Sequence, residues 1–271
     1  MIPTAPVGQA KSKHQHHHGH DVGERLYIHR HTPIHALSPA LKIASLLFFL
    51  FVVVATPITY WLSYIIFFAL IISVILVAKL PLLTVFKRSL IEIPFILFAV
   101  LMPFFGTGES FLFLNFTIYE EGLLAAAAIV AKGTIGVLGA ITLSATSTAK
   151  DILQGLERLK LPSLMVNIAT FSLRYINVVS DEMDRMKVAR QSRGFEARGV
   201  RDWKILGSAA AALFIRSYER GERVHLAMLS RGFSGNLPKL ATEAISQRDL
   251  LMALSLPITA LVLSLLDRLV I

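Results

Sequence analysis

The tetrapeptide Ser-Arg-Gly-Phe occurs twice in this chain, at Ser192–Phe195 and at Ser230–Phe233, each time with an alanine three residues before the serine. Glycine in such a place is typical of a helix C-terminus, because it adopts the left-handed C′ conformation without a Cβ clash. The phenylalanine can then pack against the last turn, while the arginine points outward at the negative end of the helix dipole. One copy is compatible with ordinary helix capping. Two copies with the same flanks predict a pair of matched cationic helix ends.

The motifs of several enzyme classes are absent from the sequence. There is no His-Glu-x-x-His pair, no Gly-rich phosphate loop ending in Lys-Ser/Thr, and no Gly-x-Ser-x-Gly elbow. The chain has no cysteine, which excludes disulfides, thiolate metal sites and cysteine nucleophiles. We therefore expect no enzyme activity and no cofactor bound by this chain.

Two clusters contain metal-ligating residue types. The acidic run Asp181-Glu182-Met183-Asp184 is a weak candidate, because helical neighbours point in different directions and Arg185 and Lys187 offer salt partners. The N-terminal histidine cluster can bind nickel or cobalt through neutral imidazole, either adventitiously as a mobile tail or in a physiological role. Its members are His14, His16, His17, His18 and His20.

The chain that positions these residues has the composition of a membrane protein. Apolar residues make up 54% of the chain and charged residues 17%, with a mean hydropathy of +0.62. A membrane-spanning helix needs about 20 mainly apolar residues, with about 17 as the lower limit. Five windows approach or meet this length, of which the first and third are marginal: Leu41–Thr56, Tyr60–Ala78, Ile91–Phe105, Gly122–Leu143 and Leu250–Leu266.

The positions of the basic residues indicate how these windows are oriented across the membrane. The link between the second and third windows carries Lys79, Lys87 and Arg88, whereas the next link carries three glutamates and no basic residue. The long segment after the fourth window holds most of the positive charge. By the positive-inside rule the N-terminus and this segment are cytoplasmic, and Ile271 lies outside. We predict a multi-pass protein of the cytoplasmic (inner) membrane.

No strand-like alternation persists along the chain, so the predicted fold class is an all-α integral membrane protein. We expect about five transmembrane helices and two long cytoplasmic helices. The predicted domains are a polar, His-rich N-terminal segment (1–36), a four-helix membrane bundle (37–144), a cytoplasmic domain (145–245) and a last transmembrane helix (246–271).

The cytoplasmic domain begins with Thr148-x-x-Asp151, a capping-box pattern that predicts a short helix to about Lys160, stopped by Pro162. An apolar stretch from Leu164 then runs into the charged sequence that ends at the first Arg-Gly, which predicts one long helix. A second long helix is expected from about Asp202 to Arg231.

Lys132 lies in the middle of the fourth window, where a charge is a functional candidate. It either faces a partner subunit or snorkels to the interface, and the sequence favours neither. The small residues around it suit close helix packing: Ala126, Gly133, Gly136 and Ala140.

Together these residues resemble the transmembrane (T) subunit of energy-coupling-factor (ECF) transporters, in particular the cobalt-type CbiQ branch. The resemblance covers nearly the whole chain. It is carried by Arg174-Tyr175-Ile176, by Asp181-Glu182 leading to Ala189-Arg190-Gln191-Ser192-Arg193-Gly194, by Arg216-Ser217-Tyr218-Glu219-Arg220 leading to Ser230-Arg231-Gly232, by His35-x-Leu37-Ser38-Pro39-x-x-Lys42 and by Glu92-x-Pro94-Phe95.

The resemblance implies that the two long helices are coupling helices whose arginine motifs dock into grooves on two ATPase subunits. The motifs are often Ala-Arg-Gly in the family and are Ser-Arg-Gly here. The implied ATPase-coupling residues are Ser192, Arg193, Gly194, Ser230, Arg231 and Gly232, and the implied supporting residues of the coupling helices are Arg190, Arg216, Glu219 and Arg220.

The resemblance also implies the partners. The T subunit holds a CbiM-like membrane subunit that captures cobalt or nickel, with or without a small accessory membrane subunit, while ATP and Mg bind in the ATPases. The expected function is to link ATP hydrolysis to that capture subunit within the lipid bilayer. The sequence does not distinguish cobalt from nickel, or identical from different ATPases.

Three other interpretations compete. A stand-alone metal-ion permease would need polar ligands converging at mid-membrane or an inverted repeat, and neither is evident. An intramembrane enzyme would need a catalytic pair. A nucleic-acid binder is suggested by the isoelectric point of about 9.9, but the positive-inside rule already accounts for that charge, so no nucleic-acid partner is expected.

Overall fold

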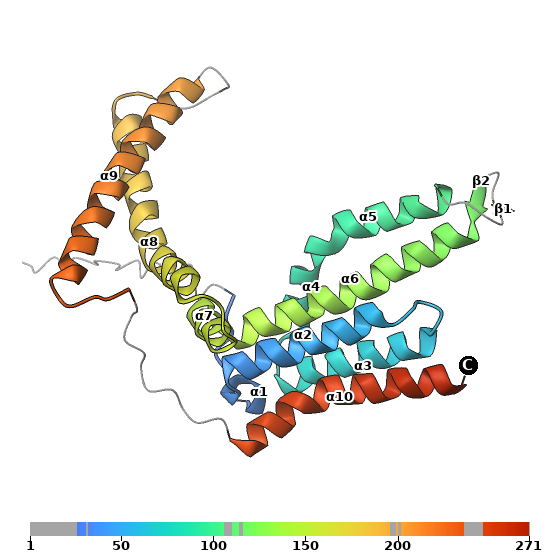
Figure 1. The fold of residues 1–271 in the computed structure, drawn as a ribbon. Coiled ribbons are helices and arrows are strands. Elements are labelled where there is room, and N and C mark those ends of the chain that lie inside the picture. The colour runs from blue at the N-terminus through green and yellow to red at the C-terminus, as the bar shows by residue number, and fades with distance from the viewer. Residues whose placement is uncertain are drawn as a thin grey trace, which may run out of the picture.

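The protein consists of a helical bundle and a two-helix arm that projects from one end of it (Figure 1). The structure, a computed structural model, describes residues 26–30, 32–105, 110–113, 116–195, 199, 202–235 and 246–270. The N-terminal histidine cluster lies outside these residues, as do Arg198 and Arg201.

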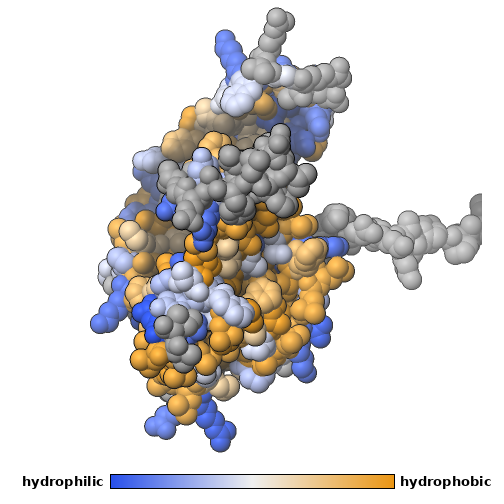
Figure 2. Space-filling model, turned by 90° about the vertical axis from the view of Figure 1, so that its right-hand side faces the viewer, coloured by the Kyte–Doolittle hydropathy of each residue, from blue (hydrophilic) through white to orange (hydrophobic). Residues whose placement is uncertain are grey.

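Four helices form the core of the bundle: α2 (Pro39–Ala55), α3 (Trp61–Val77), α6 (Glu120–Thr146) and α10 (Gln247–Val270). They match the first, second, fourth and fifth predicted windows. By length and apolar composition α6 and α10 are sufficient to cross a membrane, whereas α2 and α3 are shorter apolar helices. Large side chains that are fully buried fill the space between them, among them Phe49, Phe67, Ile71, Ile75 and Ile135. The bundle surface seen in Figure 2 is largely apolar, as lipid contact requires.

The third window is broken into short pieces. The helix α4 (Leu82–Ser89) leads through a 3₁₀ turn, η2 (Leu90–Glu92), into α5 (Ile93–Leu101) and a second turn, η3 (Met102–Phe104). Proline stands in the first turn of α5 and again in η3, where it lacks the N–H that a continuous helix would need.

A short antiparallel hairpin then joins α5 to α6. Its strands are β1 (Ser110–Phe113) and β2 (Phe116–Tyr119), with Ser110 opposite Tyr119. The sequence did not reveal it, because four residues are too few for a clear alternation. The all-α class is confirmed, with this hairpin as a local addition.

The turn between α2 and α3 is held by charged residues from other helices. Lys132 Nζ donates to the Val54 carbonyl at 3.0 Å, and Arg268 Nη2 donates to the Ala55 carbonyl at 3.1 Å. These carbonyls belong to the last turn of α2, which has no intrahelical donors and carries the negative end of the dipole. The structure thus assigns Lys132 an internal partner, which is neither of the two sequence-based alternatives.

The same end of α10 also caps α3. The carboxylate of Asp267 accepts from the backbone N–H of Ser63 at 3.2 Å and from its hydroxyl at 2.5 Å. Ser63 stands in the first turn of α3, where the N–H groups are free and the dipole is positive. Asp267 is buried, so this pairing satisfies a carboxylate that would otherwise be costly in the bundle.

Pro257 interrupts the hydrogen bonding of α10 from within. It has no N–H, so the carbonyl of Ala253, four residues earlier, lacks its helical donor. The hydroxyl of Ser45 on α2 donates to that carbonyl at 2.5 Å. The hydroxyl of Ser45 on α2 therefore replaces the helical hydrogen bond that Pro257 removes from α10.

Small residues on α6 allow close packing at some of the predicted positions. A Cβ at Gly133 would lie 2.8 Å from the carboxylate Oε1 of Glu92, which is buried and accepts from Thr134 Oγ1 at 3.0 Å. At Gly136 nothing lies within 4 Å of the place that a Cβ would take, so that glycine is not explained by packing.

The arm meets the bundle through α7 (Ala149–Arg158). Thr148 and Asp151 form the predicted capping box, and Gly155 packs against the start of α2 so closely that a Cβ would lie 2.9 Å from the backbone of Pro39 and Ala40. Beside this contact, Lys42 Nζ donates to the His35 carbonyl at 3.1 Å, to the Thr146 carbonyl at 2.8 Å and to Ser147 Oγ at 3.2 Å. α1 (Pro33–Ala36), α2 and the end of α6 are thereby tied together where the arm begins.

Candidate functional site

The arm is formed by α8 (Ser163–Ser192) and α9 (Trp203–Leu229), close to the two long helices that the sequence predicts. They run antiparallel and cross (Figure 1). Near the bundle, Asn167 Nδ2 on α8 donates to the carbonyl of Gly235, just after α9, at 2.9 Å. Farther along, Arg216 on α9 contacts Glu182 on α8.

The first Ser-Arg-Gly-Phe closes α8 as predicted. Gly194 has φ of +76°, the left-handed conformation that favours glycine. The N–H of Phe195 donates to the Arg190 carbonyl at 3.1 Å, and the N–H of Gly194 donates to the Gln191 carbonyl at 2.9 Å. These two bonds define a Schellman motif, in which the turn satisfies carbonyls that the helix leaves free.

The second copy repeats this geometry at the end of α9. Gly232 has φ of +81°, the N–H of Phe233 donates to the Met228 carbonyl at 3.0 Å, and the N–H of Gly232 donates to the Leu229 carbonyl at 3.0 Å. The two serines also match, since Ser192 and Ser230 each donate to the carbonyl four residues earlier at 3.0 Å.

These turns expose the two arginines. Arg193 and Arg231 are exposed, whereas Phe195 and Phe233 are partly buried. No cap hydrogen bond uses an arginine side chain, because the bonds involve backbone groups and serine hydroxyls alone. Binding of another molecule to either guanidinium would therefore leave the hydrogen bonds of its helix end intact.

The two ends are far apart. Because α9 starts soon after α8 ends, its 27 residues separate its C-terminus from that of α8 by roughly 40 Å, at about 1.5 Å per residue. Figure 1 shows the two C-terminal ends at opposite ends of the arm. A single small ligand cannot contact both arginines, but two protein surfaces can.

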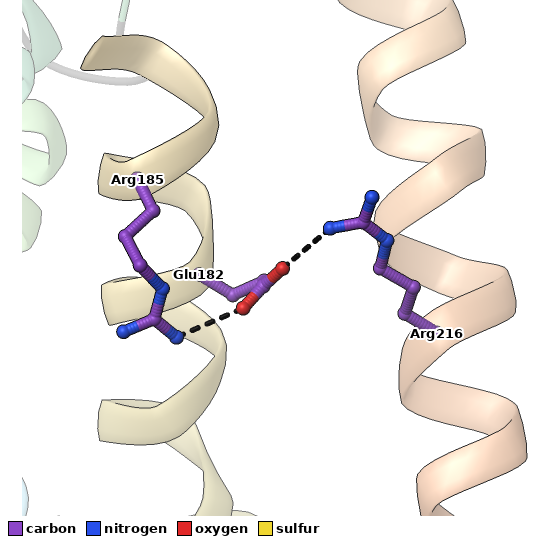
Figure 3. A network of polar contacts seen from close by, with 3 residues as sticks. All are labelled: Glu182, Arg185 and Arg216. Atoms are coloured by element: carbon purple, nitrogen blue, oxygen red, sulfur yellow. Dashed lines mark hydrogen bonds and ion pairs between the residues drawn. The ribbon is translucent and has the colours of Figure 1, made fainter. Parts of the chain in front are cut away.

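A polar network joins α8 and α9 at their crossing (Figure 3). Glu182 accepts from Arg185 Nη2 at 2.8 Å and from Arg216 Nη1 at 2.6 Å. The bonds from Arg185 and Arg216 hold the pKa of the Glu182 carboxyl below its usual value. The sequence indicates the Arg185 partner, but it does not reveal Arg216, which comes from the other helix.

The predicted supporting residues occupy three different places. The backbone carbonyl of Arg190 accepts the cap hydrogen bond from the N–H of Phe195. The side-chain Nη1 of Arg190 is buried and has no hydrogen-bond partner in the described part of the chain. Arg220 lines a groove of about 250 Å³ at the helix crossing, next to Arg216. Glu219 points away to Arg223, at a distance of 4.0 Å between two exposed side chains.

The acidic run on α8 takes part in this network through Glu182, while Asp181 and Asp184 are exposed. Among the described residues, no group of three or more His, Asp or Glu side chains is placed to hold a metal ion.

Comparison with known proteins places this architecture in a family. The family model for CbiQ, described as cobalt transport protein, matches residues 30–240, which include α7, where the arm joins the bundle, the arm itself and both arginine ends. The chain belongs to the CbiQ family. It is a transmembrane component of a cobalt- or ECF-type transporter, and such components are not themselves enzymes.

Individual relatives agree with this assignment. The chain is 28% identical to the energy-coupling factor transporter transmembrane protein EcfT of Staphylococcus aureus over 79% of this chain and 86% of that protein. It is 26% identical to the cobalt transport protein CbiQ of Rhodobacter capsulatus over 53% of this chain and 59% of that protein. An uncharacterised protein of Methanocaldococcus jannaschii is 31% identical over 91% of this chain and 88% of its own length.

Proposed function

We propose that this CbiQ-family chain is the coupling subunit of an ECF-type importer for cobalt or nickel in the cytoplasmic membrane. It links ATP hydrolysis by two ATPase subunits, which bind ATP and Mg, to a separate membrane subunit that captures the metal ion. The arm and the N-terminus lie in the cytoplasm, on the side that the basic residues select.

The observation that carries this proposal is the pair of matched helix ends. Two identical Schellman turns expose Arg193 and Arg231 about 40 Å apart, at a span set by the length of α9. Arginine suits a protein groove, because its planar fork makes two bonds to a carboxylate and stays charged when partly desolvated. Two ATPase subunits offer two such grooves.

The antiparallel crossing gives these contacts a mechanical consequence. ATPases that close on ATP move toward each other as rigid bodies. If each holds one helix end, their closure changes the angle between α8 and α9. The joint at α7 then transmits that change to the bundle, because Gly155 leaves no free space between α7 and the start of α2.

Co-purification tests the proposal. The full chain, tagged and solubilised from its native membrane in a mild detergent, should retain two ATPase subunits and a second membrane protein in fixed stoichiometry. ATPase activity should appear in this complex and be absent from the chain alone. A chain that transports cobalt or nickel in vesicles without any partner would overturn the coupling role in favour of a stand-alone permease.

A further inference from the structure

A groove of about 310 Å³ lies between α2, α3, α6 and α10 at the end of the bundle nearest the arm. The first turns of α10 and the last turns of α3 and α6 form much of its wall. Most of the lining is apolar, including Leu46, Val74, Val77, Leu143, Met252 and Leu256.

Hydroxyl groups also line the groove, but their protons are already used. Each of the five donates to a backbone carbonyl of the protein: Ser45 to Ala253, Ser73 to Leu70, Thr142 to Leu138, Thr146 to Thr142 and Ser255 to Met252. A hydroxyl has one proton to donate, so the wall has no spare hydroxyl donor for a polar ligand. An apolar chain satisfies such a wall.

The end of the groove nearest the arm is positively charged. Lys42 lines it and donates to three neutral oxygens, and no carboxylate of the described residues forms an ion pair with it. Lys79 follows Val77 on α3, and Arg248 lies one turn before Met252 on α10. Both side chains are exposed, and neither forms an ion pair with another described residue.

Lys79 also has a strained backbone. Its φ is +53°, and it occupies the C′ position of a Schellman motif in which the Leu80 N–H donates to the Ile75 carbonyl at 3.2 Å. Glycine would avoid this strain. A lysine at a helix end gains from the dipole, as Lys160 does after α7 with φ of +68°. At Lys79 that charge additionally stands two residues after Val77, which lines the apolar groove.

We propose that this groove binds one acyl chain of an anionic phospholipid, whose phosphate headgroup lies between Lys79 and Arg248. The apolar wall accepts the chain, and the cations beyond its end select the headgroup. The bound lipid fills the space between α3 and α10, so it becomes part of the bundle rather than of the bulk bilayer.

Native mass spectrometry of the detergent-purified full chain tests this proposal. Phosphatidylglycerol and phosphatidylethanolamine with the same acyl chains are titrated separately. The wild type should bind one phosphatidylglycerol more tightly than phosphatidylethanolamine. The Lys79→Gly/Arg248→Gln double variant should lose about thirty-fold in phosphatidylglycerol affinity, taking about five-fold, or about 0.7 of a decade, for each cation at a membrane surface. Lys79→Gly should also melt at a higher temperature, which separates loss of binding from loss of fold.

A second variant tests the acyl-chain site. Ser255→Trp places a large side chain in the groove and should abolish tight binding of either lipid, whereas Leu261→Trp, at another exposed position of α10, should bind as the wild type does. Wild-type affinity for phosphatidylglycerol in both Ser255→Trp and the double charge variant would overturn the proposal. Equal binding of the two lipids by the wild type would remove the headgroup selection.

Discussion

Replacing Arg193 and Arg231 by alanine should release the ATPase subunits without unfolding the chain. Both side chains are exposed and take no part in the cap hydrogen bonds. Surface substitutions of this kind change the free energy of unfolding by about 0.5 kcal/mol or less. The melting temperature of each variant should therefore remain close to that of the wild type.

The loss of affinity should be much larger than the loss of stability. Removing one partner of a buried charged pair at an interface costs about 2–5 kcal/mol. At about 1.4 kcal/mol per decade this is roughly a 30-fold to several-thousand-fold weaker ATPase contact for each arginine. Because the two ends are about 40 Å apart, the two effects should add.

Matched variants make the assay specific. Arg→Lys at either end should recover only part of the affinity, since lysine lacks the planar fork. Arg223→Ala is the control, because it removes an exposed arginine of α9 whose ion pair with Glu219 is long, at 4.0 Å. The measurement is ATPase retention on the tagged chain, followed by metal uptake in reconstituted vesicles. An Arg193→Ala/Arg231→Ala chain that retains both ATPases and transports normally would refute the reasoning.

Three further predictions concern the elements that support this site. Ser45→Ala should lower the free energy of unfolding by about 1 kcal/mol, because it leaves the buried Ala253 carbonyl without a hydrogen-bond donor. The effect should vanish in a Pro257→Ala background, where the backbone N–H of residue 257 can donate to that carbonyl. A double-mutant cycle that shows no coupling between the two positions would contradict this prediction. Gly155→Val should destabilise the contact between α7 and α2 by about 1–3 kcal/mol, because a Cβ at this position would lie 2.9 Å from the backbone of Pro39 and Ala40. The loss should appear as a lower melting temperature. An unchanged melting temperature would show that α7 can move away from α2. Because Arg185 and Arg216 lower the Glu182 pKa, the contribution of Glu182 to the α8–α9 crossing is present above the ordinary glutamate pKa of 4.5 and is lost as the pH falls through the lowered pKa. Spin labels on α8 and α9 should therefore move apart at low pH in the wild type and should be apart at every pH in Glu182→Gln. A distance that does not change with pH in either protein would exclude a role of the Glu182–Arg216 contact in holding the two helices together.

Local chemistry explains what the sequence predicted well. The glycine turns after α8 and α9 and the capping box at Thr148 each depend on residues within a few positions of one another, so their pattern is legible in the chain. The long apolar windows were equally clear, because lipid imposes the same demand on every residue of a spanning helix.

Long-range contacts could not be predicted in this way. Arg216 reaches Glu182 across 34 residues, and Lys132 reaches the Val54 carbonyl across 78. Nothing in the residue type fixes such a partner, since a lysine can equally bind a carboxylate, a carbonyl or water. The break in the third window was also missed, because its prolines stand near helix starts, where they are tolerated and give no unambiguous stop.

The cap that α10 places on the α2–α3 turn links the order of synthesis to the order of folding. Asp267 is made 204 residues after the Ser63 it binds, and Arg268 is made 213 residues after Ala55. Until then the turn enters the membrane with polar backbone groups that lipid cannot satisfy. The first hairpin therefore remains dependent on water, lipid headgroups or an insertion factor while most of the protein is being translated. A product that ends before α10 therefore lacks the protein partners that these backbone groups have in the complete fold.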